Sequence, residues 1–287
     1  MRLSRVVRNA PAVALTLLAA CGKSTDQPGA PPAPRTAPAG SARAPVLLRN
    51  DWRAAVMMQR ADSLILTLPD GSRQLQRISR AARISFEIAA NNSFTATLDS
   101  MSVSPAAESA VAAAIGTRWT GKVNGAGRIE GVQISRSSAL GDDLTRTIRS
   151  LIPLVPFDGR RVGSSWADTT SGTVQVEVFR TNERRTRKWT AGERTERGGV
   201  AVYPVRVREE FEQVGKGSQA GREMTMTAQG SRTGYYYMTV DGRVEGAVLQ
   251  DSTAQFITIP AAHQTVPTMR YSRTTLRFAS SPRDERP

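Results

Sequence analysis

Hydrophobic and polar residues alternate along most of the chain from residue 51 to residue 278. In Leu64–Leu68 and Ile84–Ile88, hydrophobic side chains recur at every second position, the period of a β-strand with one buried face. Asn124-Gly125 and Asp241-Gly242 can form the tight turns of hairpins between such runs. We therefore predict about a dozen antiparallel strands and a mainly β fold, built as one large curved sheet, a half-barrel or an open barrel.

Two segments depart from this alternation and predict helices. Residues 105–115 are rich in Ala and stop at Gly116, which is typical of a short helix. Residues 138–152 form a longer, amphipathic helix that ends before Pro153. We expect it to lie on the concave face of the sheet, where its apolar stripe lines either a ligand cavity or ordinary core. The stripe consists of Leu140, Leu144, Ile148 and Leu151.

A short internal repeat divides the β region into two parts. Residues 127–132 (GRIEGV) return as residues 242–247 (GRVEGA), each time after a turn and before a strand. The repeat favours two related β-layers, residues 51–155 and 156–280, within a single domain, with residues 281–287 as a disordered tail.

The N-terminus has the pattern of a secretory signal. Arg2, Arg5 and Arg8 precede a short apolar run at residues 10–20. This run is shorter than the roughly 20 residues that a membrane-spanning helix needs. We therefore expect residues 1–20 to be a signal peptide that is removed on export.

The run Leu18-Ala19-Ala20-Cys21 resembles a bacterial lipobox. The resemblance implies that the Cys21 thiol receives a diacylglyceryl group and that the chain is cut just before it, which anchors the protein to a membrane. Gly22, in place of an Asp that marks inner-membrane retention in many bacteria, favours the outer membrane facing the periplasm. Residues 21–50 are rich in Pro and Ala and are expected to form a disordered tether.

Composition narrows the chemistry. The single Cys excludes an internal disulfide, and together with the single His, His263, it argues against a metal centre or a conventional catalytic triad. Neighbouring acids such as Glu209 and Glu210 point to opposite faces of a strand and cannot act together on one substrate. We therefore expect no enzyme activity, no cofactor and no metal.

The formal net charge of +14 suggests an anionic partner. The basic residues concentrate around Trp189, but acids are interspersed and an exported protein does not meet the nucleoid, so nucleic acid is not the expected partner. Two interpretations stay open: a solvated hairpin face, or a contact with anionic lipid headgroups or another polyanion of the envelope. The residues concerned are Arg184, Arg185, Arg187 and Lys188.

Residues 151–169 (LIPLVPFDGRRVGSSWADT) follow the predicted helix and precede a long β region that starts at Thr173. This order is similar to that of exported bacterial lipoproteins related in architecture to the LolA-like outer-membrane-lipoprotein carriers and the mycobacterial LppX-like lipid carriers. The resemblance implies a half-barrel with an apolar concave face that binds a lipid or another apolar ligand. Soluble lipoprotein carriers are not acylated, so the anchor at Cys21 argues against a shuttling role. The alternative is a structural or assembly lipoprotein that contacts a protein partner or an envelope polyanion.

Overall fold

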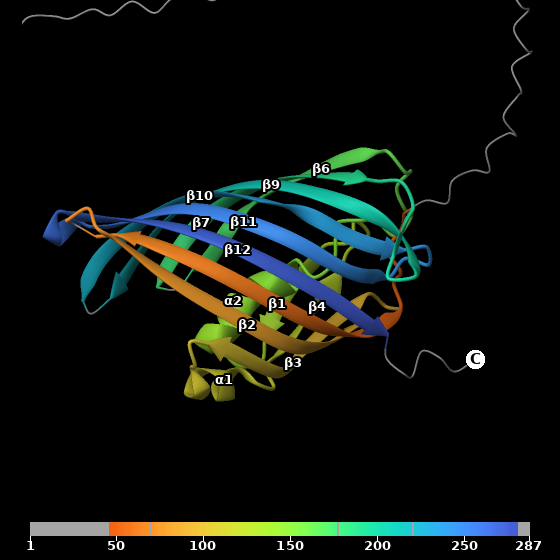
Figure 1. The fold of residues 1–287 in the computed structure, drawn as a ribbon, viewed down its shortest axis with the longest axis horizontal. Coiled ribbons are helices and arrows are strands. Elements are labelled where there is room, and N and C mark those ends of the chain that lie inside the picture. The colour runs from red at the N-terminus through yellow and green to blue at the C-terminus, as the bar shows by residue number, and fades with distance from the viewer. Residues whose placement is uncertain (1–45, 69, 177, 220, 281–287) are drawn as a thin grey trace, which may run out of the picture. The chain divides into compact units, whose positions relative to one another are not determined.

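The computed structural model describes residues 46–280 except 69, 177 and 220 (Figure 1). The predicted signal peptide at residues 1–20, Cys21, most of the tether and the tail at residues 281–287 lie outside the described residues.

In the described residues, one antiparallel sheet of twelve strands makes up the fold and confirms the mainly β prediction. It is curved and open (Figure 1). The strand order places β5 and β6 at its two edges. Its strands follow the order β5-β4-β3-β2-β1-β12-β11-β10-β9-β7-β6, and β8 pairs with β9. The strands are β1 (Trp52–Thr67), β2 (Arg73–Ile88), β3 (Ser93–Ser104), β4 (Arg118–Val123), β5 (Ile129–Ile134), β6 (Ser165–Val176), β7 (Phe179–Ala191), β8 (Thr195–Arg197), β9 (Val200–Gln219), β10 (Arg222–Thr239), β11 (Val244–Ile259) and β12 (Gln264–Ser280).

The first and last strands join the two parts of the sequence. β1 pairs with β2 on one side and with β12 on the other, so residues 51–155 and 156–280 contribute to one continuous sheet. Both copies of the short repeat lead from a turn into a strand, β5 and β11. β5 is an edge strand and β11 an interior one, so the two copies occupy different positions in the sheet.

The helices lie where the helical periods predict them. α1 spans Glu108–Ala114, α2 spans Ala139–Arg149, and a turn of 3-10 helix, η1, spans Pro260–Ala262. The Ser138 hydroxyl caps α2 by accepting a hydrogen bond from the backbone N–H of Gly141 at 3.1 Å, which satisfies a free donor of the first turn. Within the described part of the chain, no helix combines the length and the apolar character needed to cross a bilayer.

α2 packs against one face of the sheet, which we call the inner face (Figure 1). Side chains from three strands that are far apart in the strand order donate hydrogen bonds to α2 and to the segment after it. Each bond satisfies an aromatic donor at the edge of the core while fixing the position of the helical segment. The three bonds are Trp119 Nε1 to Thr145 Oγ1 (2.9 Å), Trp166 Nε1 to the Leu154 carbonyl (2.6 Å) and the Tyr236 hydroxyl to the Ser150 carbonyl (2.6 Å).

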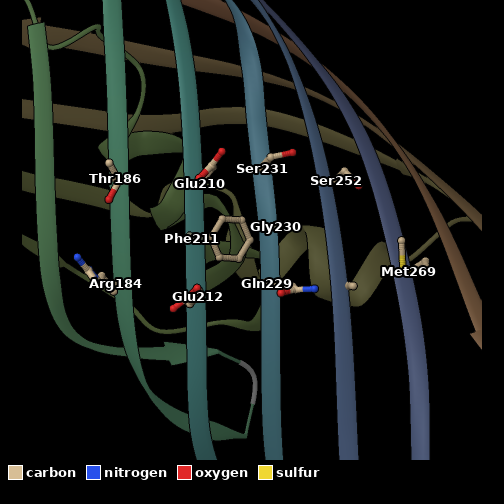
Figure 2. Close-up of a pocket in the computed structure, with 11 residues that line it drawn as sticks. Arg184, Thr186, Glu210, Phe211, Glu212, Gln229, Gly230, Ser231, Ser252 and Met269 are labelled. Carbon is tan, nitrogen blue, oxygen red and sulfur yellow. The ribbon is translucent and has the colours of Figure 1, made fainter.

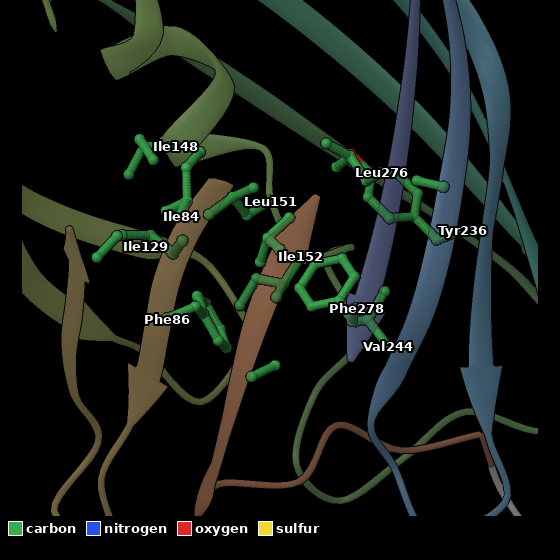
Figure 3. Packing of buried hydrophobic residues seen from close by; sticks show 14 of the residues in the cluster. Ile84, Phe86, Ile129, Ile148, Leu151, Ile152, Tyr236, Val244, Leu276 and Phe278 are labelled. Atoms are coloured by element: carbon green, nitrogen blue, oxygen red, sulfur yellow. The ribbon is translucent and has the colours of Figure 1, made fainter. Parts of the chain in front are cut away.

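The main hydrophobic core lies between α2 and the inner face. Figure 3 shows Ile148 and Leu151 facing Ile84 of β2, with Leu276 of β12 across the core. Each such side chain contributes about 1.5–3 kcal/mol when it is fully buried, so this cluster is a principal source of stability.

We expect Tyr236→Phe to lower the free energy of unfolding by about 1–3 kcal/mol, because the Ser150 carbonyl loses its donor inside the protein. Urea denaturation followed by circular dichroism measures the change. Tyr235→Phe is the matched control, since the adjacent Tyr235 side chain is exposed on the opposite face of β10. An equal loss in both variants would contradict a specific role for the Tyr236 hydroxyl.

Candidate functional site

The apolar stripe predicted on the long helix belongs to the core. Leu144, Ile148 and Leu151 are buried, and Leu140 is partly buried against the same cluster. The two hollows described below are not lined by any of these four residues. The stripe thus occupies the position expected of ordinary core residues.

The four basic residues around Trp189 do not share one face of the sheet. Along β7, Arg185 and Arg187 point to the inner face, whereas Arg184 and Lys188 are exposed on the opposite face, which we call the outer face. The alternation of side chains along a strand requires this separation. Only Arg184 and Lys188 are therefore placed to meet an external partner.

Arg187 belongs to a row of polar side chains that crosses seven neighbouring strands on the inner face. The members of this charged row lie directly opposite one another in the strand registers, and positive and negative charges alternate along most of it. In order from β6 to β1, the charged row is Asp168, Arg187, Glu209, Arg232, Asp251, Ser272 and Asp62.

Ion pairs connect the charged row at the end nearest β6. Arg187 contacts Asp168 at 3.1 Å and Glu209 at 2.6 Å, and Arg232 contacts Asp251 at 2.6 Å. Glu209 is only 4% exposed, so its charge requires these partners. A shift in the register of two such strands would therefore leave a buried charge without its partner.

At its other end the charged row reaches α2. Asp62 accepts hydrogen bonds from Ser272, from Arg60 at 3.0 Å and from Arg80 at 2.9 Å. Arg80 also pairs with Asp143 of α2 at 3.1 Å. Asp143 therefore connects α2 to the charged row through Arg80.

Burial and charge act against each other at Glu209. Burial by itself would raise the pKa of this carboxyl, but the positive charges of Arg232, Arg185 and Arg187 outweigh it and hold the pKa below its usual value. Burial likewise opposes ionisation of Glu183, whose pKa is nevertheless lowered by its hydrogen bond from Arg185. Glu209 and Glu183 are therefore carboxylates at neutral pH, and both are bound to arginines inside the protein.

The outer face contains a hollow of about 530 Å³ that crosses the middle of five strands, β7 and β9–β12 (Figure 2). Ser231, Ser252 and Ala254 are small, and the longer Glu210, Glu212, Gln229 and Met269 surround them. The residues that line this outer hollow are Arg184, Thr186, Glu210, Phe211, Glu212, Gln229, Gly230, Ser231, Ser252, Ala254 and Met269.

A second hollow of about 560 Å³ adjoins the first, because both are lined by Arg184 and Glu212. It extends toward the β6 edge and is lined by Ser171, Asn182 and Val214 among others. The two hollows therefore lie side by side on the outer face and share Arg184 and Glu212.

The polar side chains of the outer hollow have unused hydrogen-bonding capacity. Within the part of the chain that the structure describes, none of them forms a side-chain hydrogen bond or an ion pair. They offer both hydrogen-bond donors and acceptors, whereas each member of the charged row on the inner face already has a partner within the protein. These side chains are Arg184, Thr186, Glu210, Glu212, Gln229, Ser231 and Ser252.

Three exposed basic residues lie beside the outer hollow, and we call them the basic cluster: Lys188 of β7 with Arg206 and Arg208 of β9. Lys188 and Arg208 lie directly opposite each other, an arrangement of like charges that disfavours the strand pairing. Among residues 46–280 as described, none of the three has an ion-pair partner. The acids of these strands that face inward are instead bound to the inner arginines.

Sequence analysis did not identify Arg206 and Arg208, nor the outer hollow. The positions Arg206, Arg208, Glu210 and Glu212 alternate along one strand, so their common face could have been inferred. Their neighbours on β7 and β10–β12 follow only from the strand registers.

The described residues hold no group of three His, Cys, Asp or Glu side chains that could bind a metal ion. His263, at the end of η1, is exposed and adopts a left-handed backbone conformation with φ of 49°. Glu209 faces the interior and Glu210 the outer face, as the alternation predicts.

Comparison with known proteins identifies no family. No protein-family model matches the chain, and no curated protein matches its sequence. Among solved structures, the chain is similar to a LolA superfamily protein from Nitrosomonas europaea, with 9% identity, a TM-score of 0.15, and coverage of 83% of this chain and 91% of that one. A likeness of this size supports no inference about function.

The pKa of Glu209 predicts how stability depends on pH. Folding lowers the pKa of Glu209. Ionised Glu209 therefore stabilises the fold at pH values above its ordinary pKa of 4.5, and this contribution is lost as the pH falls below that value. We expect the Tm to fall as the pH is lowered below about 5. Glu209→Gln should cost about 3–5 kcal/mol at neutral pH and flatten this dependence.

Glu210→Gln is the matched control for this measurement, because Glu210 is the next residue and is exposed on the outer face. It should keep the Tm and the pH dependence of the parent. A Glu209→Gln variant that melts like the parent at every pH would contradict the stabilising role of the charged row.

Proposed function

We propose that this chain is a lipid-anchored, non-enzymatic protein of the bacterial cell envelope that binds an envelope polyanion through the outer face of its sheet. The observation that carries this proposal is the basic cluster of Lys188, Arg206 and Arg208, which is exposed and lacks ion-pair partners among the described residues. Opposed like charges lower the stability of a strand pair, and a bound anion relieves their repulsion.

The two faces of β7 and β9 support this assignment. Inward-facing Glu183 and Glu209 are paired with Arg185 and Arg187, so these acids are not available to neutralise the outer face. A sheet face that presents several exposed cations close together suits an extended anionic polymer, which can contact many of them at once.

The packing under α2 favours this proposal over an apolar ligand bound beneath the helix. Leu144, Ile148 and Leu151 fill the space between helix and sheet, and Trp119 and Tyr236 bond the helical segment in place. A lipid at that position would have to displace the core.

The membrane anchor is part of the proposal and rests on the lipobox resemblance at Cys21. Expression in a double-membrane bacterium fed an alkyne-tagged palmitate should label the parent chain and leave Cys21→Ser unlabelled, because the thiol is the acceptor. Ser24→Ala, three residues later, should be labelled like the parent. Labelling of Cys21→Ser would overturn the anchor.

Charge reversal tests the basic cluster. Lys188→Glu, Arg206→Glu and Arg208→Glu together should weaken binding of the full chain to dextran sulfate at least tenfold, because three cations beside the polymer become anions. Biolayer interferometry at low ionic strength measures the affinity, and added NaCl should reduce the affinity of the parent.

The control reverses three exposed basic residues outside the cluster, Arg118, Lys122 and Arg222, and changes the net charge equally. It should retain most of the affinity of the parent. If this control loses as much binding as the cluster variant, the attraction is a property of the net charge and the proposed docking face is wrong. Binding to phosphatidylglycerol vesicles without binding to dextran sulfate would also refute it.

A further inference from the structure

We infer that the outer hollow holds the sugar units of an acidic polysaccharide whose anionic substituents contact the basic cluster. The inference rests on the proposed function and names the chemical class of its ligand. It depends on a separate observation, which is the set of unpaired polar side chains in the outer hollow.

The outer hollow and the basic cluster are contiguous on the outer face. Lys188 lies two residues beyond Thr186 along β7, and Arg208 lies two residues before Glu210 along β9. Side chains two residues apart on a strand point to the same side about 7 Å from each other. A ligand in the hollow can therefore present a charged group to the cluster.

The chemistry of the lining matches a polyhydroxyl compound. A sugar hydroxyl both donates and accepts hydrogen bonds, and the hollow offers carboxylate acceptors at Glu210 and Glu212 together with the amide of Gln229, which does both. Figure 2 shows Glu210 beside Ser231 and Glu212 beside Gln229, which are directly opposite pairs of β9 and β10. A simple polyanion without hydroxyls would be repelled by these two carboxylates.

Exposed aromatic rings lie next to the hollow on β11 and β12, two of the strands that it crosses. Tyr271 is 47% exposed and lies opposite Ser252, and Phe256 is 44% exposed and follows Ala254 by two residues on the same face. Aromatic rings offer flat apolar surfaces that pack against the C–H faces of a sugar ring. The volume of about 530 Å³ is within the range of small-molecule sites.

The test separates the sugar from the charge by using three probes on the full chain. Dextran sulfate carries both sugar and charge, unsulfated dextran carries only the sugar, and polyphosphate carries only the charge. The hollow variant is Glu212→Ala with Gln229→Ala, an opposite pair in the hollow. The matched control is Glu223→Ala with Gln59→Ala, the same residue types on the outer face away from the hollow.

The hollow variant should bind dextran sulfate about tenfold more weakly than the parent, as expected for the loss of one or two hydrogen bonds. Its affinity for polyphosphate should stay equal or rise, because one negative charge is removed. The control should bind both probes like the parent. Unsulfated dextran should compete weakly for the parent and the control but not for the hollow variant. Thermal melting confirms that both double variants remain folded.

An unchanged or higher affinity of the hollow variant for dextran sulfate would overturn the inference. Equal weakening for both polyanions would overturn it as well, because the sugar would then have no role. If either result is found for the hollow variant while reversal of the basic cluster still abolishes binding, the proposed function stands and only the sugar site is refuted. If the parent binds neither polyanion, both fail.

Discussion

Pairing of buried charges across the inner face is the constraint on which the rest of the structure depends. An unpaired ionised group in the interior costs several kcal/mol, so the alternating row from Asp168 to Asp62 penalises any shift of one strand against the next. A shift by one residue would also move the whole hydrophobic set of a strand to the solvent. The register of seven strands is thus bound both to charge pairing and to the burial of apolar residues.

The same constraint determines what the outer face can do. The inward-facing Glu183 and Glu209 are paired with inward-facing arginines. The outer Lys188, Arg206 and Arg208 have no ion-pair partner among the described residues, because the outer acids of β9, Glu210 and Glu212, form no ion pair. On the inner face, α2 packs its apolar side chains against the sheet, and Asp143 connects it to Arg80 and hence to the charged row. Core, charged row and outer surface are consequences of one alternating pattern.

Much of the fold could be predicted because its signals are local. The turns at Asn124-Gly125 and Asp241-Gly242 do connect neighbouring strands, and Ser138 and the stripe ending at Leu151 located α2 to within a few residues. The basic cluster and the outer hollow could not be predicted, because Lys188, Arg208 and Ser252 come together only through non-local pairing. The four basic residues Arg184, Arg185, Arg187 and Lys188 are close together in the sequence, but the sheet separates them onto two faces.

By itself, the sequence determined the fold class, the helix positions, the face of each strand residue and the lipobox pattern at Cys21, because each depends on residue type at short spacing. Only the tertiary structure decided that Leu144, Ile148 and Leu151 belong to the core. Whether the space between helix and sheet is filled depends on the side chains that the sheet places opposite them. It also decided which charges are neutralised and which remain free. That outcome follows from strand order and register, and those depend on contacts between residues far apart in the chain.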